Sequence, residues 1–193
     1  GGIKEITVSG GDVDRTAGTY KIDNYEFNQK TTSLTIASTT ATASFGTVEH
    51  GLEENQTVQI AGAVPDDFNG FYKITNVTAT TFDYTPTVTP IGTATTQPSV
   101  IKRKAFTTDS THAEGAEFTI TVAPSTGVAT VVIDNPGDFY EETKTIEIKD
   151  FNLGFGGADP VIITINRVAR AANFEGSTST LTANTVTVAG VSQ

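Results

Sequence analysis

The sequence contains no cysteine, methionine or tryptophan among its 193 residues, and only two histidines. The absence of cysteine excludes disulfides, thiolate metal sites and cysteine nucleophiles. Leucine is scarce, with four residues, whereas threonine, valine and isoleucine number 36, 17 and 15. Branching at Cβ restricts the first side-chain torsion and favours strands over helices. The composition therefore predicts an all-β fold.

Positive charge is also scarce, since 12 Lys and Arg stand against 22 Asp and Glu, giving a formal net charge of −10. Nucleic-acid binding requires Lys and Arg to neutralise phosphates, so we expect no nucleic-acid partner. We interpret the one basic cluster, residues 101–104, as the solvated end of a strand, with contact to an anionic surface as the less favoured alternative. No apolar run approaches the roughly 20 residues of a membrane helix, so we expect no membrane insertion.

Strand and turn signals alternate most regularly between Thr47 and Thr85. Three short strand patterns lie in this stretch, at residues 56–60, 71–77 and 81–84. Glycine, proline, aspartate and asparagine separate them, and these residue types favour tight turns. The stretch therefore predicts an antiparallel β-meander.

Composition divides the chain into four regions: N-terminal strands with a Thr/Ser-rich connector (1–45), the meander module with a Pro/Thr-rich linker (46–98), a second β module (99–168), and a C-terminal arm or edge strand (169–193). Residues 85–98 contain three prolines, which remove backbone donors, and form the preferred domain boundary. Residues 31–44 are rich in Thr, Ser and Ala and indicate a linker or a weakly packed edge strand. We expect two small antiparallel β-sandwich or meander modules joined by the Pro/Thr-rich linker.

The clearest alternation runs over residues 115–123 and places four apolar side chains on one face: Ala116, Phe118, Ile120 and Val122. A strand at residues 128–133 completes a hairpin, and residues 134–138 predict a further turn. Beyond that turn we expect two more strands, one with Ile146 and Ile148 pointing inward and one at residues 161–165.

Groups for catalysis are few, since His50 and His112 each adjoin a turn and no Gly-x-Ser-x-Gly elbow is present. Residues 66–70 are rich in oxygen ligands but lack the spacing and the closing Glu of a calcium loop. The glycine-rich residues 154–157 lead into a strand pattern, whereas a phosphate loop requires a helix. We therefore expect no enzyme activity, no catalytic residues, no metal site and no cofactor.

Tyrosines and loop carboxylates are the remaining candidates for binding. A tyrosine ring has an apolar face and a polar tip, which suits a sugar as well as it suits a half-buried strand. The candidate contact residues for a glycan or a protein partner are Asp66, Asp67, Tyr72 and Tyr84. The lack of tryptophan weakens the case for a glycan.

Two stretches resemble β modules of tailed-phage virion proteins. An ordered set of short segments is similar to a module of tail fibre, baseplate and related components: His50-Gly51-Leu52, residues 58–63, Phe68-Asn69-Gly70, residues 72–75 and residues 81–84. Residues 115–165 resemble a second module, frequent in virion proteins of cyanobacterial phages. That second family usually has a Gly-Ser-Gly-Tyr turn followed by Gly-Asp, and this sequence departs from the pattern at residues 137–144.

The resemblance implies a non-enzymatic structural protein of a tailed-phage virion, in a tail fibre, baseplate or other tail component, with capsid decoration as another position. It implies a homo-oligomer, partners among copies of itself and other virion proteins, and a location in the extracellular particle. Two other classes stay open: a module that binds a host-surface glycan, and a subunit of a bacterial extracellular filament or adhesin.

Overall fold

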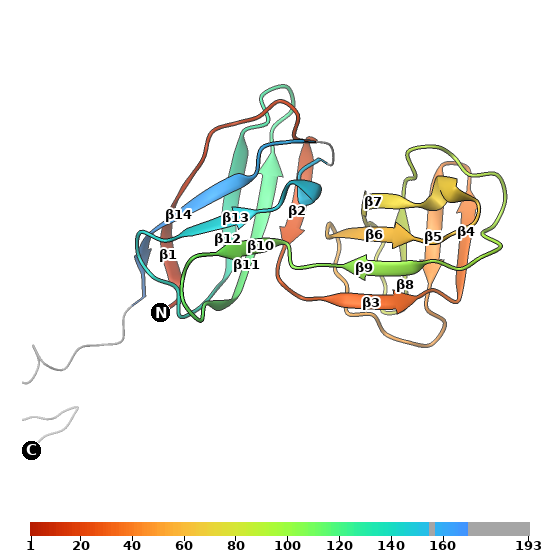
Figure 1. The fold of residues 1–193 in the computed structure, drawn as a ribbon, viewed down its shortest axis with the longest axis horizontal. Coiled ribbons are helices and arrows are strands. Elements are labelled where there is room, and N and C mark those ends of the chain that lie inside the picture. The colour runs from red at the N-terminus through yellow and green to blue at the C-terminus, as the bar shows by residue number, and fades with distance from the viewer. Residues whose placement is uncertain (155–156, 170–193) are drawn as a thin grey trace, which may run out of the picture.

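The computed structural model describes residues 1–154 and 157–169, which form two β-sandwiches side by side (Figure 1). The split domain is built from residues 1–23 and 104–169, and the inserted domain from residues 24–103; each has its own buried hydrophobic cluster. The all-β class is confirmed, since helical structure in the described residues is limited to two 3₁₀ turns, η1 (Asp66–Phe68) and η2 (Asp150–Asn152). No helix in this part of the chain is long and apolar enough to cross a membrane.

The split domain consists of two antiparallel sheets. The first contains, in spatial order, β1 (Ile3–Val8), β14 (Val161–Val168), β13 (Thr145–Ile148) and β10 (Phe106–Thr108). The second contains β12 (Ala129–Asp138), β11 (Glu114–Val122) and β2 (Gly18–Ile22). The first two strands of the chain therefore complete sheets whose other strands come from its second half.

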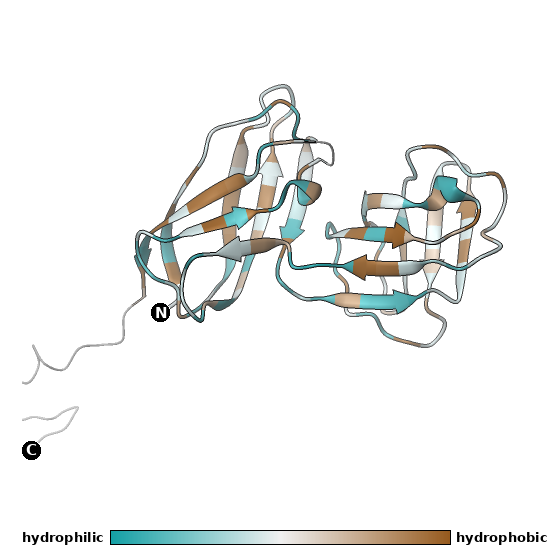
Figure 2. Ribbon diagram, viewed as in Figure 1, coloured by the Kyte–Doolittle hydropathy of each residue, from teal (hydrophilic) through white to brown (hydrophobic). Residues whose placement is uncertain are grey.

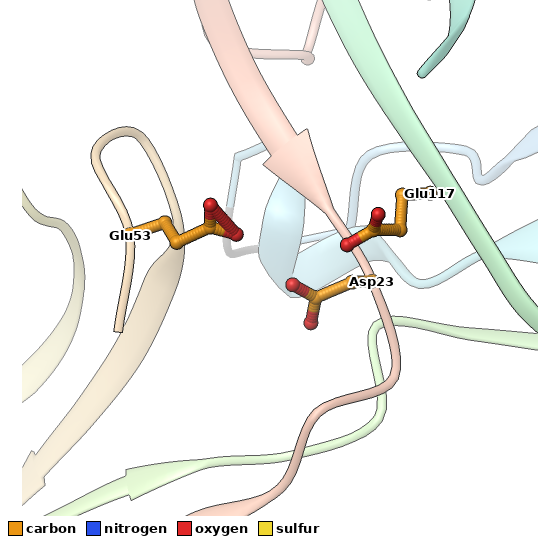
Figure 3. A group of neighbouring side chains, drawn as sticks. All are labelled: Asp23, Glu53 and Glu117. Atoms are coloured by element: carbon orange, nitrogen blue, oxygen red, sulfur yellow. The ribbon is translucent and has the colours of Figure 1, made fainter. Parts of the chain in front are cut away.

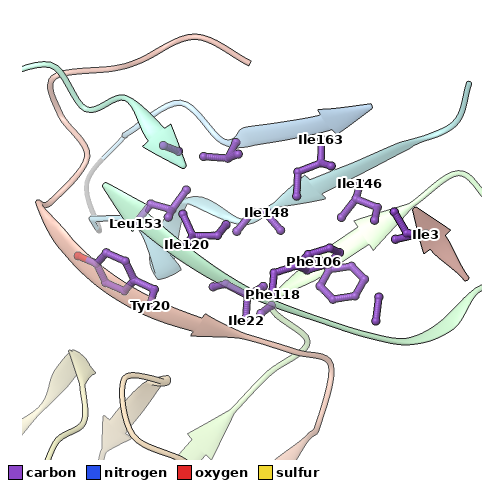
Figure 4. Close-up of a cluster of buried hydrophobic side chains, with 14 of the residues drawn as sticks. Ile3, Tyr20, Ile22, Phe106, Phe118, Ile120, Ile146, Ile148, Leu153 and Ile163 are labelled. Atoms are coloured by element: carbon purple, nitrogen blue, oxygen red, sulfur yellow. The ribbon is translucent and has the colours of Figure 1, made fainter. Parts of the chain in front are cut away.

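Side-chain alternation builds the core of the split domain. On β11 the predicted face is confirmed, because Ala116, Phe118, Ile120 and Val122 are all buried. The predicted inward residues of β13, Ile146 and Ile148, are fully buried between the sheets (Figure 4). The rings of Phe106 and Phe118 meet edge to face, with centroids 5.7 Å apart. Each fully buried side chain of this size contributes roughly 1.5–3 kcal/mol to folding.

The predicted turn at residues 134–138 is wrong, because β12 continues as a strand to Asp138. Its register on β11 shifts between the pairs Glu117–Asn135 and Phe118–Ile133, which leaves Asp134 as an extra residue on β12. This is a β-bulge, and β12 is an edge strand, so Pro136 is tolerated there. The turn-forming residue types therefore mark an irregularity within a strand.

The inserted domain also consists of two antiparallel sheets. One contains β3 (Phe27–Lys30), β9 (Ser99–Lys102), β6 (Thr57–Ala61) and β7 (Gly70–Lys73). The other contains β4 (Ser33–Ala37), β5 (Thr40–Ser44) and β8 (Thr81–Tyr84). The predicted meander forms in part. β6 pairs with β7, and Thr75, just beyond the end of β7, bridges to Asp83 of β8. The main pairing of β8, however, is with β5 in the other sheet. Figure 2 shows the hydrophobic and hydrophilic alternation along β6 and β13.

Residues 31–44 form a core hairpin, β4–β5, and the linker interpretation is wrong. Ala41 lies opposite Tyr84 and Ala43 opposite Phe82 in the pairing of β5 with β8, and all four side chains are buried. The small alanines leave space for the two rings. The weak apolar pattern of β5 is therefore complementary to the aromatic pattern of β8.

The domain boundaries differ from the predicted boundary at residues 85–98. Residues 85–98 cross within the inserted domain, where Val64 bridges to Thr96 and the Ala94 N–H donates to the Leu34 carbonyl at 3.0 Å. The chain enters the inserted domain after Asp23 and leaves it before Ala105, whose N–H donates to the Asp23 carbonyl at 3.2 Å. One domain is thus inserted into the other through two adjacent connections. The expected arm at residues 169–193 lies outside the described residues, apart from Ala169.

Candidate functional site

The two tyrosines predicted to contact a ligand lie in the core of the inserted domain. Tyr84 is 1% exposed and Tyr72 is 8% exposed, and their rings stack with centroids 4.7 Å apart. Tyr84 donates its hydroxyl to the Phe68 carbonyl at 3.0 Å, and burial raises its pKa well above the ordinary value. Tyr84 therefore has no free ring face for a sugar.

Asp66 and Asp67 are exposed on η1, beside a hollow of about 470 Å³ that Tyr72 and Val88 also line. Asn69 fixes the backbone here, because its side-chain oxygen accepts from the Ala63 N–H at 2.9 Å and its amide donates to the Ala63 carbonyl at 3.1 Å. Three of the four predicted contact residues thus surround one hollow, and Tyr84 lies beneath them.

Neither histidine is arranged for catalysis. His50 is 1% exposed and lies among the rings of Phe27, Phe45 and Phe82. Its Nδ1 accepts from the Leu52 N–H at 3.0 Å, which places the proton on Nε2 for donation to the Thr81 carbonyl at 3.3 Å. Burial lowers the pKa of His50 and keeps it neutral. His112 lies exposed in a loop.

The residues that sequence reasoning missed lie where the two domains meet. Lys102 is 3% exposed and Asp23 is 6% exposed, and the Lys102 Nζ lies 2.5 Å from the Asp23 Oδ1. Lys102 also donates to the Tyr25 carbonyl at 2.7 Å, and Gln56 donates its amide to the Asp23 Oδ2 at 2.6 Å. We call Asp23, Tyr25, Gln56 and Lys102 the junction network. The interpretation of Lys102 as a solvated strand end is wrong, although Arg103 and Lys104 are exposed.

Strand geometry explains why Lys102 points inward. On β9 the buried positions are Val100 and Lys102, so the lysine continues the core-facing row. Asp23 follows the last residue of β2, at the point where the chain leaves the split domain. A buried charge is tolerated only with a partner and with its remaining hydrogen bonds made, and the junction network provides both.

Two more carboxylates lie beside Asp23. Oxygens of Asp23, Glu53 and Glu117 lie within 4.8 Å of one another, and we call these residues the acidic trio (Figure 3). Ile22 pairs with Phe118 in the register of β2 and β11, which places Glu117 next to Asp23. Glu53 comes from a loop of the inserted domain, so the acidic trio spans both domains. Oxygen ligands of this kind suit calcium, but both Asp23 oxygens already accept hydrogen bonds from Lys102 and Gln56.

A hollow of about 460 Å³ lies beside the acidic trio. Its lining includes Asp23 and Glu117 as well as Tyr25, Lys104 and Glu114. The carboxyl groups at the junction therefore have a route to solvent, although Asp23 itself is buried.

The inserted domain also covers the edge strand β2. The Lys21 N–H donates to the Asn55 carbonyl at 3.0 Å, and Lys73 donates to the Thr19 carbonyl at 3.0 Å. The Lys73 Nζ lies 4.9 Å from the centroid of the Tyr20 ring, and burial lowers the pKa of Lys73 and raises that of Tyr20. These contacts occupy backbone groups that an exposed edge strand would offer to another chain.

Arg15 has a structural role within the split domain. It is 5% exposed and donates to four backbone carbonyls at 2.9–3.0 Å, those of Gly10, Gly127, Asp159 and Pro160. Gly10 belongs to the first segment of the split domain and the other three to the second. One planar guanidinium thus ties the two segments together.

Comparisons with known proteins give no relative of this chain. No protein-family model matches it, and no curated protein and no solved structure matches it.

Proposed function

We propose that this chain is a non-enzymatic structural protein of a tailed-phage virion, in a tail fibre, baseplate or other tail component. Its partners would be copies of itself and other virion proteins. The resemblance of residues 50–84 and 115–165 to virion β modules supports this proposal. The observation that carries it is the junction, where two β-sandwiches are held as one unit by buried polar contacts.

A structural subunit needs a fixed geometry between its parts. Domains joined by one flexible linker and a small interface move relative to each other by default. Here two adjacent connections join the domains, and the junction network adds a buried ion pair between residues on both sides of the boundary. On another side of the boundary the rings of Phe71 and Phe151 lie with centroids 5.8 Å apart. The domains are therefore held in one orientation.

The buried His50 and Lys102 of the inserted domain serve its fold. His50 is bonded through both ring nitrogens to backbone atoms, and Lys102 is neutralised by Asp23. The glycan-binding alternative loses Tyr84, which is covered by its own domain. These observations favour a mechanical role over a catalytic or lectin-like role.

Location in the particle is the direct test of this proposal. Phage particles purified on a density gradient from the source of the gene are analysed by mass spectrometry and labelled with an immunogold antibody against the purified chain. We expect the chain to sediment with the particles and the gold to mark the tail. Gold on bacterial surface filaments, with particles free of the chain, would contradict the proposal and favour an adhesin.

A further inference from the structure

We propose that Lys102 and Asp23 are joined by an isopeptide bond, which the chain forms by itself and which closes the neck between its two domains. The amine nitrogen and the carboxyl oxygen lie 2.5 Å apart, and both side chains are almost fully buried. The two residues are 79 positions apart and lie on the two connections to the inserted domain. The bond would therefore close the inserted domain into a covalent loop.

Both reacting groups are held from several sides. The Lys102 Nζ donates to the Tyr25 carbonyl at 2.7 Å as well as to Asp23. Asp23 accepts from the Tyr25 N–H at 3.0 Å on Oδ1 and from the Gln56 amide at 2.6 Å on Oδ2. Such positioning converts a reaction between two molecules into an intramolecular step, which is worth effective concentrations of about 10⁵–10⁸ M in favourable cases.

The reaction is a condensation that needs no oxidant and no external reagent. The ammonium group of Lys102 gives up two protons, and its nitrogen lone pair forms a bond to the Cγ of Asp23. One carboxyl C–O bond breaks, and that oxygen leaves with the two protons as water. An ammonium and a carboxylate thus become a neutral amide and one water molecule. The step also removes two opposite charges from a buried site, where charges are costly.

Glu117 is placed to carry the protons. It lies beside Asp23 in the pairing of β2 with β11, and its carboxylate belongs to the acidic trio (Figure 3). A carboxylate oxygen of Glu117 lies within 4.8 Å of an Asp23 oxygen, a gap that one water molecule can bridge. Through such a water Glu117 can take up a proton released by the amine and deliver it to the leaving oxygen. Glu117 also lines the hollow next to Asp23, which gives the water molecule a path out.

The ion pair between Lys21 and Asp134 lacks two features of the proposed site, which are burial and neighbouring carboxylates. Its Nζ and Oδ2 lie 3.6 Å apart, and the two side chains are 21% and 29% exposed. Water therefore reaches this pair, and the acidic trio is not part of it. We expect Lys21 and Asp134 to remain a reversible ion pair, which makes them an internal control.

Intact mass measured on the purified, denatured full-length chain tests the bond. We expect a mass lower than the sequence mass by one water molecule. After trypsin digestion, the peptide of residues 22–30 should remain joined to the peptide that ends at Arg103, because cleavage after a modified Lys102 is blocked. The full sequence mass together with two separate peptides would overturn the proposal. A missing water with separate peptides, as from a succinimide at Asp23, would overturn it as well.

Several variants test whether Lys102 and Asp23 are the two joined residues, so the test does not depend on the folding of any single variant. Lys102→Arg and Asp23→Ala should show the full sequence mass. Asp23→Asn keeps the shape of the side chain and should give the same joined peptides with loss of ammonia instead of water. Asp134→Asn should cross-link like the parent chain. Joined peptides in Lys102→Arg would overturn the assignment.

The role of Glu117 is tested by rate. The chain is synthesised in a cell-free reaction, samples are quenched in acid at intervals, and the cross-linked fraction is followed by mass. Loss of a general acid–base group typically slows a reaction by about 100-fold or more, so we expect such slowing in Glu117→Gln. Glu114→Gln, an exposed glutamate on the same strand, is the matched control and should react at the parent rate. An unchanged rate in Glu117→Gln would overturn the assignment of Glu117.

Discussion

The two sandwiches have similar sheets but differently filled cores. The split domain is filled mainly by isoleucines from β11, β13 and β14, with Phe106 against Phe118. The inserted domain is filled by rings, with Phe27, Phe45, His50 and Phe82 in one group and Tyr72 stacked on Tyr84 nearby. The inserted domain is also one continuous stretch of chain, whereas the split domain needs both ends of the described chain. The inserted domain therefore contains every strand of its own sheets, whereas the split domain depends on pairing between distant parts of the chain.

Cutting the chain gives the largest effect. Residues 23–103 alone should fold, because both sheets of the inserted domain are complete within them and Asp23 remains to pair with the buried Lys102. Residues 104–169 alone should not fold, because β11 loses β2 and β14 loses β1. Far-UV circular dichroism and amide NMR spectra of the two fragments check this. A folded fragment of residues 104–169 would show that these residues do not need β1 and β2, and it would favour two modules that follow each other along the chain.

Removing one ring from each core should act locally. Phe82→Ala and Phe118→Ala each delete a fully buried ring and should cost about 3–5 kcal/mol of unfolding free energy. Hydrogen exchange followed by mass spectrometry should show loss of protection in the inserted domain for Phe82→Ala and in the split domain for Phe118→Ala. Equal loss in both domains for either variant would show that the sandwiches unfold as one unit.

Arg15 should matter only to the split domain. Arg15→Ala leaves four carbonyls without their donor and should lower the unfolding free energy of that domain by roughly 2–3 kcal/mol. Arg15→Lys should restore little, because an ammonium lacks the planar array of donors. Hydrogen exchange at residues 10–16 and 126–128 measures the effect. Loss of protection from hydrogen exchange in the inserted domain would show that the two domains are not independent in stability.

The smallest expected effect is the contribution of His50 to the pH dependence of the inserted domain's stability. Burial lowers the pKa of His50 from its ordinary 6.5, so the folded domain prefers the neutral ring. As pH falls below 6.5, the unfolded chain binds a proton that the folded domain resists, and stability decreases until the lowered pKa is passed. Urea unfolding of the inserted domain at several pH values should show this decrease in the parent chain and a smaller one in His50→Gln. His112→Asn, at an exposed site, should behave like the parent.

The strands with strong local patterns could be predicted from the sequence. β11 and the inward residues of β13 follow from period-two alternation alone. β5 could not be predicted, because Ala41 and Ala43 make sense only opposite Tyr84 and Phe82, about forty positions away in the chain. The bulge of β12 was read as a turn because Asn, Pro and Gly serve in both. Local residue types do not specify the partner strand.

The junction had no sequence signal at all. Lys102 belongs to a run of three basic residues, two of which are exposed, and only the row of inward positions on β9 distinguishes it. Its partner Asp23 lies 79 positions away and follows a strand of the other domain.

Of the four predicted contact residues, Asp66, Asp67 and Tyr72 lie around one hollow, whereas Tyr84 is buried in the core of the inserted domain. Aromatic residues on alternating strands are as suitable for a core as for a surface, and the pattern does not separate the two.

The pairing of β1 with β14 determines how this chain would carry tension. The Ala169 N–H donates to the Gly2 carbonyl at 2.6 Å, and Ile3 lies opposite Val168 at the same end of the sheet. A pull applied at residues 2 and 169 would peel these strands apart one hydrogen bond at a time, starting from that end. The inserted domain would remain outside the load path, because its entry and exit are held together at Asp23 and Ala105. It would project as a side arm that stays folded while the sheet that anchors it opens.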